Sequence, residues 1–366
     1  MLSACIEPIE ININSEKAEK LVVNGMITDQ PGPHRVNLSL SSDVFNNEDV
    51  TKVSGAIVTI HDDKGQIFVL SESSQGNYVT TESTIQGEVG RSYTLKIELK
   101  DGRTYESTPE KLNPNSGLSS IDSQYSVRRE RDNQGVLNQL NGFDIFVDVE
   151  ESPNSDQSLY RWRWTGTYES LTYPQNHTQD TIINADTFTV PKPWPCSGWV
   201  FQSPAFPPTD PTVGILKQIA PCECCTCWIE EYSQLVLLFE VGLSQTSPKQ
   251  IATNFIAVDN ARFYNKYHIN VEQISLSRTG FEFWKSIQSQ QNQGSIFDTT
   301  LGTTPTNIAG VNNNDEVLGY FGASSIKSIS KFIFPSEIPQ EIPATPVSTF
   351  PCTWTVNSSN VKPSFW

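Results

Sequence analysis

The N-terminal third of the chain consists of short runs in which apolar and polar residues alternate. In residues 35–40 the side chains of Val36, Leu38 and Leu40 fall on one face, because successive side chains of a strand point to opposite sides. Residues 21–27 form another apolar-rich run of strand length. Such runs, rich in Val, Ile, Thr and aromatic residues and bounded by turn residues, predict β-strands.

Turn residues separate these runs at the spacing of β-hairpins. The Asp- and Gly-containing turn at 62–65 precedes a strand at 66–70, and Asp101-Gly102 separates two further alternating runs. A two-residue Asp-Gly turn is a strong hairpin signal, because Gly adopts the positive φ that the turn requires. We therefore predict an Ig-like or transthyretin-like β-sandwich over residues 20–112, preceded by a tether at residues 1–19.

A second alternating region follows the Pro- and Asn-rich linker at 109–117. Residues 113–340 are expected to form a β-rich domain with one helix, and residues 341–366 an extended tail rich in Pro, Thr and Ser. Within this region, residues 169–228 are irregular in pattern and rich in Pro, Trp and Cys. A long segment of this kind is usually functional or cross-linked.

An aromatic stripe runs along the strand expected at 159–168. Tyr160, Trp162 and Trp164 share one face, whereas Arg161 and Arg163 lie on the other. Aromatic residues at period two are usually core residues, and stacking of a sugar ring on the stripe is the alternative.

One segment has the spacing of an amphipathic helix, near residues 277–292. Ser277 is a good N-cap, Phe281 and Trp284 are three residues apart, and Gly294 can end the helix. We expect this helix to pack on a sheet.

Composition places the chain among folded β-rich proteins and limits its partners. A length of 366 residues suits about two domains of roughly 100–200 residues each. The formal net charge is −16, and a glutamate interrupts the basic cluster at 128–131. Binding to a phosphate backbone needs a positive patch, so we expect no nucleic-acid partner.

The first five residues resemble the end of a bacterial lipoprotein signal. Leu2-Ser3-Ala4 supplies small residues before Cys5, whose thiol would carry the lipid. The charged and apolar regions of a signal peptide do not precede it, so we expect the numbering to start inside the signal. Glu7 and Glu10 loosely resemble a surface-export signal, and solvated linker charges are the alternative.

Of the seven cysteines, six remain if Cys5 is lipidated, and an even number in an exported protein favours disulfides. Adjacent Cys224 and Cys225 project differently, so each is expected to have a separate partner, with Cys196 and Cys352 the distant candidates. A zinc site and partly free thiols stay open as alternatives, although four Cys in six residues are too compressed for common zinc spacings. The candidates for disulfide bonding are Cys196, Cys222, Cys224, Cys225, Cys227 and Cys352.

The order of elements along the chain carries a family resemblance. The C-terminal elements are residues 267–271, 281–285, 294–298, 305–310 and 316–325, and the N-terminal ones are 21–25, 55–60 and 90–95. In this order they resemble the domain-of-unknown-function 4249 family of Bacteroidota outer-membrane lipoproteins, over most of the chain. The dense cysteine cluster departs from the family pattern, so no role for it is carried over.

The resemblance implies an accessory protein, because family members are often encoded beside TonB-dependent transporters. We expect a non-catalytic, lipid-anchored binding subunit of such a transporter or of another outer-membrane β-barrel complex, at the cell surface and without a cofactor. A structural or adhesive surface protein is the first alternative. A glycan or peptide hydrolase using paired carboxylates is the second, but no G-x-S-x-G, H-E-x-x-H or Cys/His pairing occurs in the sequence.

The lipid anchor is the first testable prediction. In natively expressed protein, Cys5 should carry an N-terminal lipid and residues 1–4 should be absent. Intact mass of the membrane-extracted protein measures this, and an unmodified Met1 would contradict it.

A second prediction concerns glycosylation. Asp180-Thr181-Ile182 and Asp298-Thr299-Thr300 resemble the Bacteroidota O-glycosylation signature, although Asp-Thr is also common in ordinary turns. We expect a glycan on Thr181 more readily than on Thr299. Glycopeptide mapping that finds both threonines unmodified would exclude glycosylation at these sites.

Overall fold

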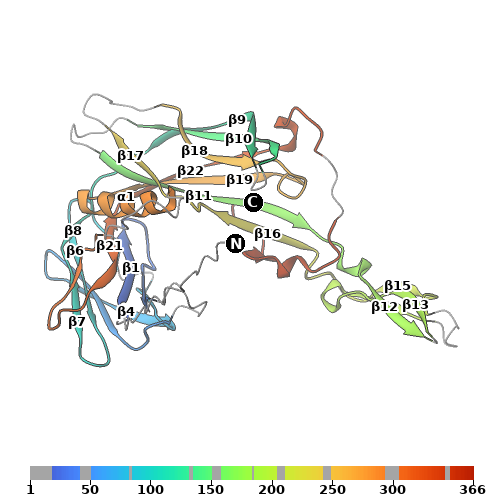
Figure 1. The fold of residues 1–366 in the computed structure, drawn as a ribbon, viewed down its shortest axis with the longest axis horizontal. Coiled ribbons are helices and arrows are strands. Elements are labelled where there is room, and N and C mark those ends of the chain that lie inside the picture. The colour runs from blue at the N-terminus through green and yellow to red at the C-terminus, as the bar shows by residue number, and fades with distance from the viewer. Residues whose placement is uncertain are drawn as a thin grey trace, which may run out of the picture. The chain divides into compact units, whose positions relative to one another are not determined.

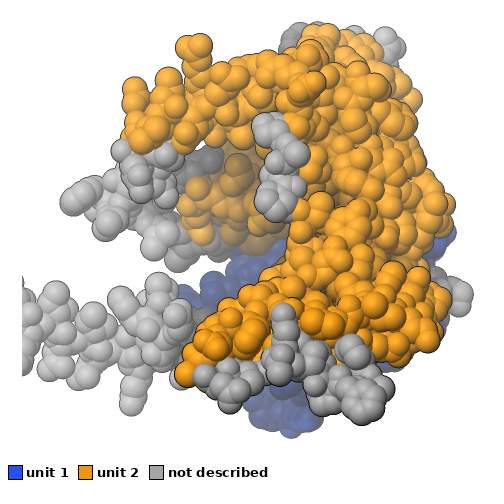
Figure 2. All heavy atoms as spheres, turned by 90° about the vertical axis from the view of Figure 1, so that its right-hand side faces the viewer, with its two compact units in different colours: residues 1–112, 301–323 blue, residues 113–300, 324–366 orange. Residues whose placement is uncertain are grey.

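The computed structural model describes residues 19–41, 51–81, 85–131, 135–150, 158–183, 185–203, 211–241, 249–292, 305–342 and 347–366. The chain forms two compact units, residues 1–112 with 301–323, and residues 113–300 with 324–366 (Figure 2). Cys5, Thr299 and Gly294 lie outside the described residues, so their expected roles stay predictions.

Unit 1 is an all-β structure, as the alternating pattern predicts. Its strands are β1 (Leu21–Thr28), β2 (Arg35–Leu40), β3 (Ile57–Asp62), β4 (Ile67–Ser74), β5 (Asn77–Val79), β6 (Ser92–Glu98), β7 (Thr104–Ser107), β8 (Glu110–Lys111), β20 (Ile308–Gly310) and β21 (Val317–Ser324). The hydrogen-bonded order is β20-β7-β6-β3-β4-β5-β2-β1-β21, with β8 on β6.

Strand β4 links the two halves of this order. Its first residues, from Ile67 to Leu70, pair with β3, and the residues from Ser71 onward pair with β5. Buried side chains alternate along the strands, and Val36 and Leu38 are fully buried as predicted. The expected Asp101-Gly102 hairpin joins β6 to β7, with Gly102 at φ 85°. The glycine thus supplies the turn conformation that other residues rarely adopt.

Unit 1 also contains a segment that the sequence pattern assigned to the second domain. We expected one continuous domain over residues 113–340, but 301–323 belongs to unit 1. Here β20 pairs with β7, and β21 lies beside β1. Phe321 is fully buried, and its backbone N–H donates to Asn307 Oδ1 at 3.0 Å. Alternation along a strand shows which face is buried but not which sheet it joins, so the pattern did not indicate this return.

Unit 2 stacks a small sheet on a larger one (Figure 1). The small sheet has the order β18-β10-β9, and the larger sheet has β22-β19-β11-β16-β23, with β17 also on β11. The strands are β9 (Leu118–Arg131), β10 (Leu137–Val149), β11 (Ser158–Leu171), β16 (Thr226–Tyr232), β17 (Leu237–Val241), β18 (Ile251–Ala257), β19 (Tyr267–Ser275), β22 (Ile326–Ile333) and β23 (Ser358–Ser359). Phe143 and Ile145 of β10 pack with Ile269 and Val271 of β19 in the core.

The aromatic stripe of β11 faces this core. Tyr160 and Trp162 are 1% and 2% exposed, and Trp164 packs against the same cluster. Tyr160 and Trp162 therefore have the core position that their period-two spacing predicted, and neither offers an open face to a sugar. On the opposite face, Arg163 forms an ion pair with Glu272.

The predicted helix is α1 (Arg278–Asn292), and it packs on the arginine face of β11. Ser277 caps it as expected, because its Oγ accepts a hydrogen bond from Gly280 N at 3.0 Å. The Arg161 guanidinium lies 3.6 Å from the ring centre of Trp284. Burial, reinforced by the charge of Arg163, lowers the pKa of Arg161 to about 10, so the guanidinium stays protonated at neutral pH. No described helix has the length and apolar character to cross a membrane.

The C-terminal segment, expected to be an extended tail, is tied back through Cys352 and also contacts the larger sheet. Within residues 341–366, β23 pairs with Trp228 and Ile229 of β16. Phe365 stacks on His268 with ring centres 4.2 Å apart. Aromatic contacts and a short strand pairing thus hold this segment against the larger sheet.

The return of residues 305–323 to unit 1 can be tested with one core truncation. Phe321→Ala should lower the free energy of unfolding of unit 1 by about 3–5 kcal/mol, because the buried ring leaves a cavity. Val311→Ala, at a side chain that is 63% exposed in the same segment, is the control and should change it by less than about 0.5 kcal/mol. Denaturant unfolding monitored by circular dichroism measures both, and equal effects would contradict the assignment.

Candidate functional site

A cross-linked arm, residues 172–225, lies between β11 and β16 and is the most distinctive feature of unit 2. It was expected to be irregular, but it contains two two-stranded ribbons (Figure 1). One ribbon pairs β12 (Thr178–Ile183) with β13 (Asp186–Pro191), and the other pairs β14 (Trp199–Gln202) with β15 (Ile215–Gln218). Short 3-10 turns precede them, η1 (Pro174–Asn176) and η2 (Pro195–Ser197). The pattern did not predict these strands, because each has only four to six residues and they lie in a Pro-rich stretch.

Three disulfides close the base of the arm. They are Cys196–Cys224, Cys222–Cys225 and Cys227–Cys352, and they use all six candidate cysteines. The prediction of separate partners for Cys224 and Cys225 is confirmed, but the near partner Cys222 takes Cys225, and Cys352 pairs with Cys227. Since every described cysteine is in a disulfide, none of them supplies a thiolate to a metal. Among the described residues no group of three His, Cys, Asp or Glu side chains could hold a metal ion.

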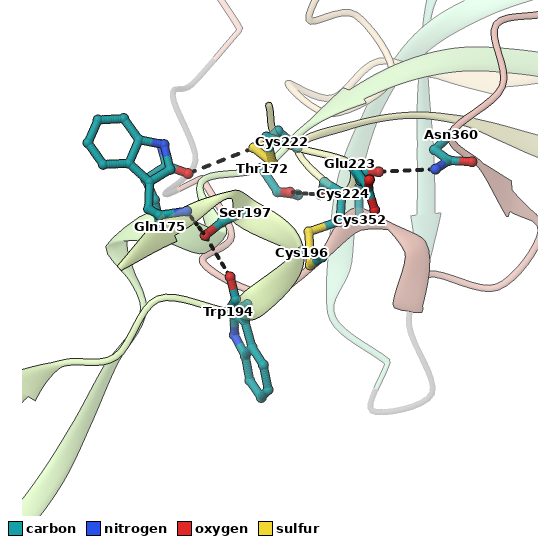
Figure 3. The surroundings of a disulfide bond; sticks show 12 residues. Thr172, Gln175, Trp194, Cys196, Ser197, Cys222, Glu223, Cys224, Cys352 and Asn360 are labelled. Atoms are coloured by element: carbon teal, nitrogen blue, oxygen red, sulfur yellow. Dashed lines mark hydrogen bonds between the residues drawn. A yellow bond between two sulfur atoms is a disulfide. The ribbon is translucent and has the colours of Figure 1, made fainter. Parts of the chain in front are cut away.

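Hydrogen bonds to backbone carbonyls tie the same base to the end of β11 and to the C-terminal segment (Figure 3). The carbonyl of Cys224 accepts from Thr172 Oγ1 and from Cys352 N, each at 3.1 Å. Asn360 Nδ2 donates to the carbonyl of Glu223 at 3.1 Å. Disulfides and hydrogen bonds therefore converge on residues 222–225, and they join three segments that are far apart in sequence. We call this region the knot.

Four aromatic side chains beside the knot form what we call the platform: His177, Trp194, Phe350 and Trp354. Trp194 is central, with ring centres 4.7 Å from both His177 and Trp354. Phe350 and Trp354 are 51% and 60% exposed, so the platform is open to solvent. His177 Nδ1 is 2.9 Å from the carbonyl oxygen of Lys192, which orients the ring.

The ribbons of the arm also carry exposed aliphatic side chains. Ile182 of the first ribbon is 73% exposed, and Ile215 of the second is 65% exposed. Exposed apolar groups at this density often mark an interaction surface. Thr181, the described glycosylation candidate, lies half-buried on β12 opposite Phe188. Its modification stays a prediction.

Sequence reasoning identified the cysteines but missed most of the platform. His177, Phe350 and Trp354 were not singled out, since they lie far apart in the chain and in segments without periodicity. The one usable signal was Phe350 and Trp354 on either side of Cys352, because a disulfide at Cys352 brings both side chains to its partner.

Comparison with known proteins gives one match. A family model described as a domain of unknown function, DUF4249, matches residues 6–330, which is most of the chain. No curated protein and no solved structure matches.

The disulfides should differ in their contributions to stability, because they close loops of different length. The sequence separations are 125, 28 and 3 residues for Cys227–Cys352, Cys196–Cys224 and Cys222–Cys225. Taken singly, the loops correspond to about 5, about 4 and about 2 kcal/mol of chain entropy in the unfolded state. Replacing Cys227 and Cys352 together by Ala should therefore lower the unfolding midpoint most.

The Cys222→Ala, Cys225→Ala double variant is the matched control for that change, and it should have the smallest effect. Thiol titration of the denatured, unreduced wild-type protein should find none of these six cysteines free. Four or more free thiols accompanied by zinc would contradict the disulfide assignment, and an equal loss of stability in both double variants would contradict the role of loop length.

Proposed function

Because the chain belongs to the DUF4249 family, whose description assigns no activity, we propose a function from the geometry of the arm. We propose that the protein is a non-catalytic accessory subunit that docks on an outer-membrane β-barrel, such as a TonB-dependent transporter. In this proposal a lipid on Cys5 anchors it at the cell surface, and the arm contacts the barrel.

The observation that carries the proposal is the knot beside an exposed platform. An isolated two-stranded ribbon is marginally stable in water, so the ribbons gain little from their own pairing. The three disulfides restrict the chain at their base before any partner binds. Pre-ordering of this kind lowers the entropy lost on association.

The chemistry of the platform suits a protein partner. Trp is among the residues most enriched in binding hot spots, and Trp354 and Phe350 present large apolar areas to solvent. Ile182 and Ile215 are further exposed apolar side chains, one on each ribbon. A cluster of exposed aromatic residues matches the composition of a protein–protein interface core.

The test is retention of the partner in detergent-solubilised membranes. The double variant Trp354→Ala, Phe350→Ala should bind the barrel protein about 30-fold or more weakly, the effect expected for loss of a hot spot. Co-purification of a stoichiometric barrel protein should fall accordingly. Crosslinking followed by mass spectrometry should place the contacts of the wild-type protein on residues 172–225 and 347–354.

Phe334→Ala is the matched control, because Phe334 is 46% exposed in unit 2 but lies outside the platform. It should co-purify like the wild type. Equal retention by the platform variant would exclude the arm as the docking surface. Retention of glycan or polymer without any barrel would favour the structural or adhesive alternative.

A further inference from the structure

Cys222–Cys225 is the most exposed of the three disulfides in the knot. Both of its cysteines are partly exposed. By contrast, Cys227 and Cys352 are 0% and 1% exposed, and Cys224 of the third disulfide is 1% exposed. A disulfide exchanges with a dissolved thiol only where the attacking thiolate reaches one of its sulfurs, so exposed disulfides are the labile ones. Of the three, Cys222–Cys225 is the one that a thiol outside the protein can reach.

The knot depends on this cross-link less than on the other two. It closes a separation of only three residues, so it restricts the unfolded chain least. Backbone hydrogen bonds that involve no sulfur hold both sides of the same short loop. Glu223 N donates to the carbonyl of Cys196 at 2.9 Å, and Thr172 N donates to the carbonyl of Cys225 at 2.8 Å. Opening the Cys222–Cys225 bond therefore leaves the loop attached at both ends.

The two sulfurs of this disulfide have different surroundings. Cys225 Sγ lies 3.8 Å from Oε1 of Gln175, on the turn η1. Cys222 lies between Pro221 and Glu223, which are both exposed. An incoming thiolate thus reaches Cys222 Sγ more readily, and Cys225 becomes the leaving group. Once reduced, the Cys225 thiol has an acceptor in the Gln175 side chain.

We propose that Cys222–Cys225 is a site of thiol–disulfide exchange, at which a dithiol opens one cross-link of the knot and leaves the other two closed. A thiolate of the dithiol attacks Cys222 Sγ, the bond to Cys225 breaks, and its electron pair stays on Cys225 Sγ, which takes up a proton. The second thiolate of the dithiol then attacks the mixed disulfide and releases Cys222 as a thiol. The dithiol gives up two electrons and two protons, and the protein gains both.

The reduced protein keeps its arm in place, because Cys196–Cys224 and Cys227–Cys352 still join the base of the arm to β16 and to the C-terminal segment. The knot thus combines two structural disulfides with one that can be opened and closed again. The proposal does not rest on docking by the arm, since it uses no residue of the platform and its test needs no partner protein.

The test is timed reduction of the full-length protein by dithiothreitol under native conditions, followed by acid quenching, alkylation and peptide mass mapping. Cys222 and Cys225 should become alkylated about tenfold or more faster than the other four cysteines of the knot. The preference should be lost in denaturant, where burial no longer protects those four. Removing the dithiol and adding glutathione disulfide should restore the Cys222–Cys225 bond.

The double variant Cys222→Ala, Cys225→Ala is the matched control. It should keep the near-ultraviolet circular dichroism of the wild type and yield no thiol under the native conditions that open the wild-type bond. The wild-type time course carries the test by itself if this variant does not fold. Earlier reduction of either other disulfide, simultaneous opening of all three, or no reduction of the native protein would overturn the proposal.

A second arm of the experiment replaces dithiothreitol by reduced thioredoxin, a protein dithiol. Selective opening of Cys222–Cys225 by both reagents would support the proposal with a protein as the reductant. Selective opening by dithiothreitol alone would support it with a small dithiol as the reductant.

Discussion

Strand β11 has pairing partners on both edges and packed side chains on both faces, and most features of unit 2 depend on it. One edge pairs with β19, and the other pairs first with β17 and then with β16. Its tryptophan face fills the core and borders a cavity of about 570 Å³, whereas Arg161 on the other face contacts Trp284 of α1. The two-residue repeat of a strand therefore places the core and the cavity on one side of the backbone and the helix on the other.

The same strand connects this core to the arm. Its last residue, Leu171, pairs with Thr226, and the following Thr172 bonds to the carbonyls of Cys224 and Cys225. The knot thus begins where the regular sheet ends. Beyond this point the ribbons have few buried apolar side chains, so covalent cross-links replace the packing that stabilises the rest of the unit. Because cross-links rather than packing hold the arm, its apolar side chains can be exposed.

The platform and the cavity differ in how open they are to solvent. The platform is open and aromatic, which suits a large and relatively flat partner. The cavity beside β11 is partly open, and glutamines of α1 hold the loop that borders it.

The sequence by itself determined features that depend on neighbours along the chain. Alternation predicted the buried faces of β2 and β11, Asp101-Gly102 predicted a hairpin, and Ser277 predicted the start of α1. The even set of cysteines beyond Cys5 predicted disulfides. These features follow from local side-chain spacing and backbone preference, which can be read without the fold.

Tertiary structure alone decided which distant segments meet. Strand pairing placed residues 305–323 in unit 1. The sequence pattern could not predict this, because alternation shows which face of a strand is buried but not which strand lies next to it. Six cysteines allow about 15 pairings, and the path of the chain selected the one that brings Cys352 to Cys227. The same path put Phe350 and Trp354 beside Trp194, and β18 opposite β11 around a cavity. The platform and the cavity are made by contacts between residues distant in sequence, so neither could be predicted from local patterns.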